Sequence, residues 1–191
     1  MTTPAPQSSS PPPLVLARGI AGVRDELVAQ WAAWLASRHA SGPALDAPTT
    51  ERLLGLIADL LVLMVGPLRR EVDETWFAAA ELYGQLAALR GLAAGEVVEE
   101  LQHLRELLAR ELADFFVALP LRQQLPTVLR VNHVVDTAVT SAVVGYTDAL
   151  VASMFSREGV PVPTTDSVQE AVAQIEGLEA EVRLLLERSP R

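Results

Sequence analysis

The sequence predicts an all-α fold: a bundle of five helices, then a linker and a C-terminal helix with coiled-coil spacing. Half of the 191 residues are apolar but only 5% are aromatic, so the core must be built mainly from aliphatic side chains. Leu and Ala are strong helix formers, whereas strands favour β-branched and aromatic residues. No stretch alternates apolar and polar residues as a strand does, and no segment repeats at a fixed period.

Gly and Pro residues divide the first half of the chain into three helix-sized pieces. A Pro/Ser-rich tail over 1–14 is expected to be disordered, and a helical sensor or regulatory domain follows over 15–157. The first helix has apolar residues at helical spacing, and a Thr before the second can cap its free amides. These helices are expected from Val15 or Ile20 to His39, from Thr49 or Thr50 to Gly66, and from Asp73 to Gly91.

Two long helices and a separate last helix are predicted for the second half. Leu residues form a clear stripe over 96–119, and Pro120 and Pro126 bracket a turn before a helix over 127–155. A Pro-rich linker over 158–165 leads into a signalling or dimerisation helix over 166–188. Its apolar residues keep close to the 3.5-residue period of a two-stranded coiled coil. They are Val168, Val172, Ile175, Leu178, Val182 and Leu185.

Charge and motif content exclude several classes of function. The net charge is −9 and all 15 cationic residues are Arg, so the surface repels nucleic-acid phosphates and anionic lipid. The absence of Cys excludes disulfides and thiolate metal sites, and the absence of Lys excludes a P-loop. No nucleophile-elbow motif is present. We therefore expect a protein that is not an enzyme, with no catalytic residue, no metal site and no nucleic-acid partner.

The segment 53–68 is the strongest membrane candidate in the sequence. It is shorter than the ~20 residues that a spanning helix needs. It also contains Asp59 and ends in Gly66 and Pro67. We expect a buried core helix here, no integral membrane segment and a cytoplasmic location; a protein bound peripherally to membranes is the alternative.

The helix predicted over 127–155 carries polar residues in its first turns. Asn132 and Asp136 are four residues apart, so they stack on one flank of the helix. Arg105 and Arg130 are the candidate cationic partners for a half-buried Asp136. We predict a structural or signalling clamp between helices rather than an active site. The clamp residues are Asn132, Asp136, Arg105 and Tyr146.

A metal site and a heme site are the alternatives to a structural clamp. Glu100 and His103 form an E-x-x-H, the spacing that di-iron helical bundles use. Both residues are offset from the Leu stripe of their helix, which favours a solvated acidic face instead. His133 and His103 are the candidate heme or ligand contacts, because a helical sensor can use His as an axial ligand. The expected cofactor is none, with heme as the alternative.

Two apolar faces on the 127–155 helix predict a homodimer. One stripe runs along one side of this helix, and Val144 and Val151 lie nearly opposite it. A helix with two apolar faces either lies at the centre of its bundle or packs its own bundle on one side and a partner on the other. The first stripe consists of Val131, Val135, Ala138, Ala142, Tyr146 and Ala149.

Three stretches of the chain resemble the N-terminal domain of the RsbRD-type co-antagonists, a domain also found ahead of bacterial sensor histidine kinases. The resemblance covers about residues 20–155 and rests on the segments 31–38, 88–108 and 129–150. The shared residues are patterned rather than chemically unusual. They are Arg90, Gly95, Glu99 or Glu100, Leu104, Arg105, Asn132, Asp136 and Tyr146.

This resemblance implies a globin-like sensor domain without heme that dimerises and acts in bacterial stress-response signalling. It would relay a signal to a downstream kinase or STAS-domain protein, either as part of a sensor histidine kinase or as its partner. The chain departs from the family because only a linker and one helix follow the domain. We expect two bundles to pair through their long helices, and a change in that packing to reach the 166–188 helix.

Overall fold

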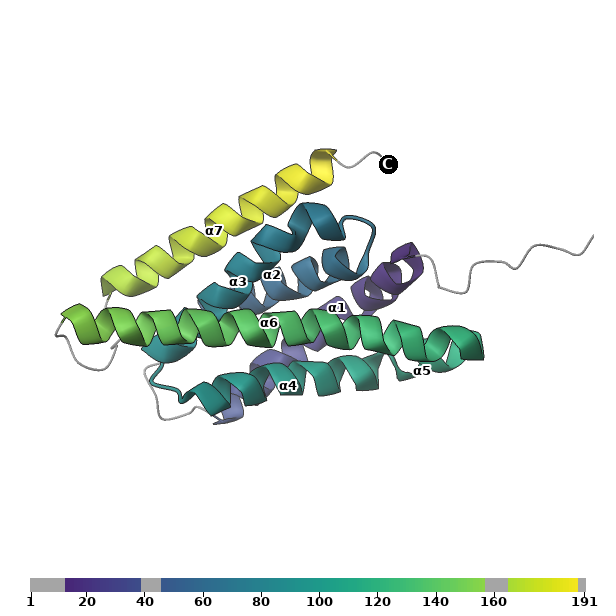
Figure 1. The fold of residues 1–191 in the computed structure, drawn as a ribbon, viewed down its shortest axis with the longest axis horizontal. Helices are drawn as coiled ribbons and strands as arrows, with labels where there is room; N and C mark the ends of the chain where they lie inside the picture. The colour runs from purple at the N-terminus through teal and green to yellow at the C-terminus, as the bar shows by residue number, and fades with distance from the viewer. Residues whose placement is uncertain (1–12, 39–45, 157–164, 189–191) are drawn as a thin grey trace, which may run out of the picture.

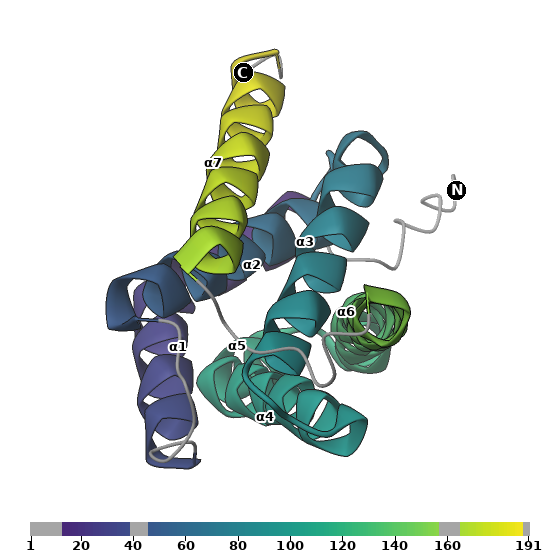
Figure 2. The same cartoon turned by 90° about the vertical axis from the view of Figure 1, so that its left-hand side faces the viewer.

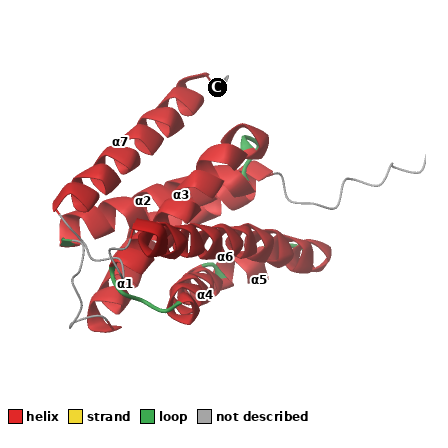
Figure 3. Cartoon of the chain, turned by 60° about the vertical axis from the view of Figure 1, so that its left-hand side comes forward, coloured by secondary structure: helices red, strands yellow, loops and turns green. Residues whose placement is uncertain are grey.

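The computed structural model describes residues 13–38, 46–156 and 165–188, and this part of the chain is entirely helical apart from short connections (Figure 3). The predicted tail over 1–14 and linker over 158–165 lie outside it, except that Pro13 and Leu14 begin α1 and Thr165 begins α7. The helices are α1 Pro13–Arg38, α2 Ala47–Val65, α3 Arg69–Leu89, α4 Ala94–Glu111, α5 Ala113–Ala118, α6 Leu121–Ser156 and α7 Thr165–Arg188.

Several helix boundaries differ from the sequence prediction, among them the start of α3, which is Arg69 instead of Asp73. Asp46, not Thr49 or Thr50, caps α2, because its Oδ1 accepts a hydrogen bond from the Thr49 amide at 2.8 Å. The fourth predicted helix is interrupted at Leu112, where the backbone (φ −97°, ψ 7°) leaves the helical region and separates α4 from the short α5. The long helix α6 begins at Leu121 and continues through Pro126, so the expected turn between the two prolines is wrong. Pro126 has no amide proton to donate to the Arg122 carbonyl, so α6 continues through it at the cost of one backbone hydrogen bond.

Helix α3 is the centre of the bundle. Figure 1 shows α6 running along the long axis in front of the other helices, and Figure 2, which views α6 end-on, shows α3 between α6 and α2. More than half of the residues of α3 are buried, including Trp76, Tyr83 and Leu86. Helices α1 and α4 close the remaining sides, and α7 lies across α2 and α3.

Two glycines allow α3 and α6 to touch at the level of their backbones. A Cβ placed on Gly84 of α3 would lie 1.8 Å from the carbonyl oxygen of Ala142, and one on Gly145 of α6 would lie 2.1 Å from the carbonyl oxygen of Glu81. Real Cβ atoms do not approach an oxygen so closely, so any other residue at either position would force the helices apart. The predicted stripe on α6 is buried at this contact, with Val135, Ala138 and Ala142 almost fully covered.

The segment that looked most like a membrane candidate is a core helix. Most of α2 is buried, including Leu54, Leu60 and Leu61, as the sequence predicted. Among the described residues, the stretch Leu121–Phe155 of α6 is instead the one long and apolar enough to cross a membrane by length and composition. Helices of soluble proteins also pass this test, and one face of α6 packs against α3 and α4.

We predict that Gly84→Ala lowers the free energy of unfolding by about 1–3 kcal/mol, because the new methyl group overpacks a backbone contact. The matched control is Gly22→Ala on α1, where a Cβ would meet no atom within 4 Å. That change should stabilise the helix by about 0.5–1 kcal/mol. Urea unfolding followed by circular dichroism measures both. Equal stability of the two variants would contradict the close crossing.

Candidate functional site

The predicted polar clamp divides into two separate contacts. Arg105 on α4 forms an ion pair with Asp136 on α6, and the Asp136 side chain remains 59% exposed. Asn132 is half-buried one turn earlier, and the described contacts include no hydrogen bond from it to Asp136. Tyr146 lies on the opposite, buried side of α6, where its hydroxyl donates to the Leu92 carbonyl at 2.8 Å. Arg105 and Asp136 therefore link α4 to α6, and Tyr146 links α6 to the turn between α3 and α4.

The two candidate ligand histidines lie in different environments. His133 is exposed on the outward side of α6. His103 on α4 is mostly covered because its ring stacks on Trp34 of α1, with centroids 4.2 Å apart, and its Nδ1 lies 3.5 Å from Glu106. Arg38 covers the same indole, 5.1 Å from the ring centroid. Within the described ranges no three His, Asp or Glu side chains gather closely enough to hold a metal ion.

Glu100 is buried, so the expectation that it lies on a solvated acidic face is wrong. Its side chain is 1% exposed and accepts hydrogen bonds from the Tyr83 hydroxyl at 2.6 Å and from Arg90 Nη2 at 2.7 Å. The ring of Trp31 stacks on Tyr83, with centroids 5.8 Å apart. Glu100 sits at the edge of the apolar stripe of α4, and the turn at Gly91 (φ 76°) brings Arg90 to it from the end of α3. In the sequence, burial of Glu100 is indicated only by Arg90 and Gly91 ahead of it, because a turn there can bring Arg90 to Glu100. A helical wheel of α4 alone does not show this.

Burial and the neighbouring carboxylate raise the pKa of the Tyr83 hydroxyl well above its ordinary value. Burial opposes the charge of Arg90, but its hydrogen bonds to Glu100 outweigh this effect and the pKa of Arg90 rises. The triad of Tyr83, Arg90 and Glu100 therefore holds a neutral phenol, a guanidinium and a carboxylate in contact. Such a group fixes the relative positions of α3 and α4.

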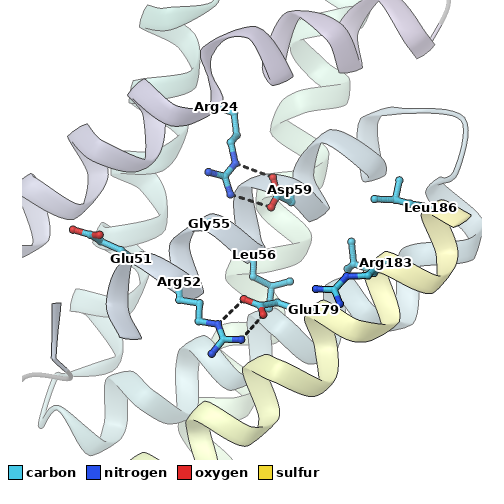
Figure 4. A pocket seen from close by; sticks show the side chains of 10 residues that line it. Arg24, Glu51, Arg52, Gly55, Leu56, Asp59, Glu179, Arg183 and Leu186 are labelled. Atoms are coloured by element: carbon cyan, nitrogen blue, oxygen red, sulfur yellow. Dashed lines mark hydrogen bonds and ion pairs between the residues drawn. The ribbon is translucent and has the colours of Figure 1, made fainter. Parts of the chain in front are cut away.

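An open cleft of about 390 Å³ lies where α7 crosses α2 beside α1 (Figure 4). Two arginine forks span it. Arg24 of α1 donates to both oxygens of Asp59 at 2.8 and 2.9 Å, and Arg52 of α2 donates to both oxygens of Glu179 at 2.8 and 2.5 Å. Both carboxylates raise the pKa of the arginine that they bind.

Helix α7 is held to the bundle by ion pairs and by an apolar face that packs on α2 and α3. Arg52 also reaches Glu176 at 3.0 Å, so one arginine of α2 binds two carboxylates on successive turns of α7. The apolar residues Ala171, Ile175 and Val182 of α7 are buried against the bundle. Leu184 and Leu186 are each 50% exposed. The sequence predicted the apolar spacing of α7 but not its packing on its own bundle. The same spacing suits a groove of this chain and a helix of another chain.

Comparison of the chain with models of protein families, with curated proteins and with solved structures finds no match.

We predict that Glu100→Gln lowers the free energy of unfolding by about 3–5 kcal/mol, because it leaves the buried Arg90 charge without a counter-ion. The control is the adjacent Glu99→Gln, which removes only a surface ion pair with Arg38 between side chains that are 45% and 52% exposed. That loss should stay below about 1 kcal/mol. Chemical denaturation of both variants tests the difference, and similar losses would place Glu100 at the surface.

A second prediction concerns alkaline pH. The pKa of Tyr83 is raised in the folded chain, so the native state keeps this proton after the unfolded chain has lost it. The resulting stability is complete below a pH of about 10 and declines at about 1.4 kcal/mol per pH unit above it, until native Tyr83 ionises. Tyr83→Phe should remove this part of the slope, as measured by urea unfolding between neutral and alkaline pH. Parallel pH profiles for wild type and variant would disprove the burial of the phenol.

Proposed function

We propose that this chain is a non-catalytic regulatory domain of bacterial signal transduction whose C-terminal helix, α7, carries the output. The observation that carries the proposal is the position of α7. Ile175 and Val182, two residues of its predicted coiled-coil stripe, are buried against its own bundle. A stripe occupied in this way is not available to a partner helix, so docking of α7 and pairing of α7 exclude each other.

Docking of α7 is suited to being reversible. Its ion pairs with α2 are partly exposed, with the Arg52 and Glu179 side chains 38% and 29% exposed. Exposed ion pairs contribute little stability and are screened by salt. Two states that differ by only a few kcal/mol can be exchanged by a ligand that binds one of them better. A ligand or protein that binds the released α7, or that takes Arg52 from Glu179, would therefore shift the balance toward the released helix.

The rest of the bundle is suited to staying fixed. The α3 and α6 backbones are in contact, and the triad around Glu100 joins α3 to α4. A rigid body with one weakly held helix is a common arrangement for a switch. The released stripe would pair with a helix of the output protein, a kinase or STAS-domain protein as the resemblance to RsbRD-type domains implies. We further propose that the globin-like domain acts as a cytoplasmic homodimer without heme.

We predict that Arg52→Glu frees α7, because it replaces two attractive contacts with repulsion from Glu176 and Glu179. Hydrogen exchange followed by mass spectrometry should show faster exchange over residues 165–188 and little change over α3 and α6. The double variant Arg52→Glu with Glu179→Arg should restore much of the protection. Arg18→Glu, an exposed charge reversal on α1 outside the cleft, is the control. We call the ion pairs of Arg52 with Glu176 and Glu179 the α7 latch. Unchanged hydrogen exchange of α7 in Arg52→Glu would rule out this latch.

A further inference from the structure

The outward face of α6 is mainly apolar at both ends, where Arg122 and Asp148 are the charged exceptions, and polar in the middle. At one end Leu121, Leu125 and Leu129 are 84%, 65% and 56% exposed, and at the other Val144 and Val151 are 46% and 43% exposed. Met154 and Phe155 continue this second end at 76% and 85%. We call these seven residues the α6 outer face. They follow one another at helical spacing on the side away from α3, where Figure 2 shows no described helix beyond α6. Groups of exposed large apolar residues like these two are typical of binding surfaces.

We propose that the α6 outer face pairs antiparallel with the same face of a second copy of the chain. In such a pair, with its two-fold axis near residue 138, Leu121 lies at the level of Phe155, and Leu125 at the level of Val151, of the other copy. Each apolar end then covers the other apolar end. The polar middle meets itself, and there Asp136 is already neutralised by Arg105 of its own chain. This inference rests on the dimer of the proposed function and adds its surface and direction.

Charge complementarity sets the direction of the pair. Arg130 and Asp148 are 18 positions apart, about five turns at 3.6 residues per turn, so both lie on the same flank of the outer face. Neither side chain makes a hydrogen bond or an ion pair to any other described residue. When two helices pair antiparallel about a two-fold axis, a flank faces the same flank of the partner. Arg130 of each copy then meets Asp148 of the other, which gives two symmetric ion pairs.

A parallel pair offers no such match. There a flank faces the opposite flank, which carries uncharged residues such as Asn132, Val139 and Val143. A membrane is a poorer occupant as well, because Arg130, Asp136 and Asp148 would enter the lipid while the other face of α6 stays packed on α3 and α4. The second copy is the occupant that satisfies both the apolar ends and the two charges.

The first experiment is sedimentation equilibrium of the full chain with charge reversals. Wild type should be a dimer, and Arg130→Asp and Asp148→Arg should each weaken dimerisation by about tenfold or more, since each change places like charges together twice. The double variant carrying both changes should recover the dimer. Glu170→Arg on α7 makes the same change of charge away from α6 and should have no effect. A monomeric wild type, or a double variant no better than the singles, would overturn the proposal.

The second experiment uses the absence of cysteine in the chain. A mixture of Leu125→Cys and Val151→Cys chains should form a disulfide-linked dimer on mild oxidation, and neither variant alone should. In the antiparallel pair two copies of position 125 are 26 residues apart along the axis, roughly 39 Å at 1.5 Å per residue. Self-linking of either single variant would show a parallel pair instead.

Two further measurements separate this proposal from its alternatives. Binding of wild type to vesicles of neutral and anionic lipid, lost in Leu125→Asp, would assign the face to a membrane and contradict the dimer. Hydrogen exchange of α7 in Asp148→Arg should match wild type, because the outer face and the α7 latch are on different sides of the bundle (Figure 2). Loss of the dimer with an intact latch, or the reverse, would therefore show which proposal fails.

Discussion

The close crossing of α3 and α6 is the constraint on which the rest of the structure depends. Gly84 and Gly145 have no side chain at the point where a Cβ would meet the opposite backbone, and this brings the two helices into direct contact. Trp76 can then donate to Thr137 at 3.0 Å, and Tyr146 can reach the Leu92 carbonyl. Because one side of α6 is used by this contact, several of its large apolar residues on the other side remain exposed.

Two groups of charges show how burial decides what an ion pair does. Arg90 and Glu100 are enclosed, and either one alone would be a buried uncompensated charge, so α3 and α4 are held in one arrangement. Arg52 makes a similar fork with Glu179 at the rim of an open cleft, where water can solvate both groups if they separate. The same chemistry thus gives an enclosed connection in the core and a partly solvated one at α7.

Local pattern was enough for the helices and for one face of α6, but not for contacts between distant segments. The stripe from Val131 to Ala149 follows from 3.6-residue periodicity. Charge alone offered Arg105 and Arg130 as partners of Asp136, and Arg105 is the one that pairs with it. Burial of Glu100 depends on its contacts with Arg90 and Tyr83 of another helix. A helical wheel of α4 contains neither residue, so it could not predict this burial. The docking of α7 has the same origin, since its spacing suits any apolar groove. Leu112, where α4 ends, carries no breaker signal in its side chain.

Nuclear magnetic resonance tests the central contact most directly, through nuclear Overhauser effects between the α protons of the two glycines and the opposite helix. The Cβ direction of Gly84 points to within 2.9 Å of the Tyr146 amide nitrogen, and that of Gly145 to within 2.8 Å of the Glu81 Cα. Strong cross-peaks from Gly84 Hα to the Tyr146 amide proton and from Gly145 Hα to Glu81 Hα are therefore expected. Their absence in a folded, helical sample would show that side chains separate α3 from α6, which would contradict the backbone contact between these helices.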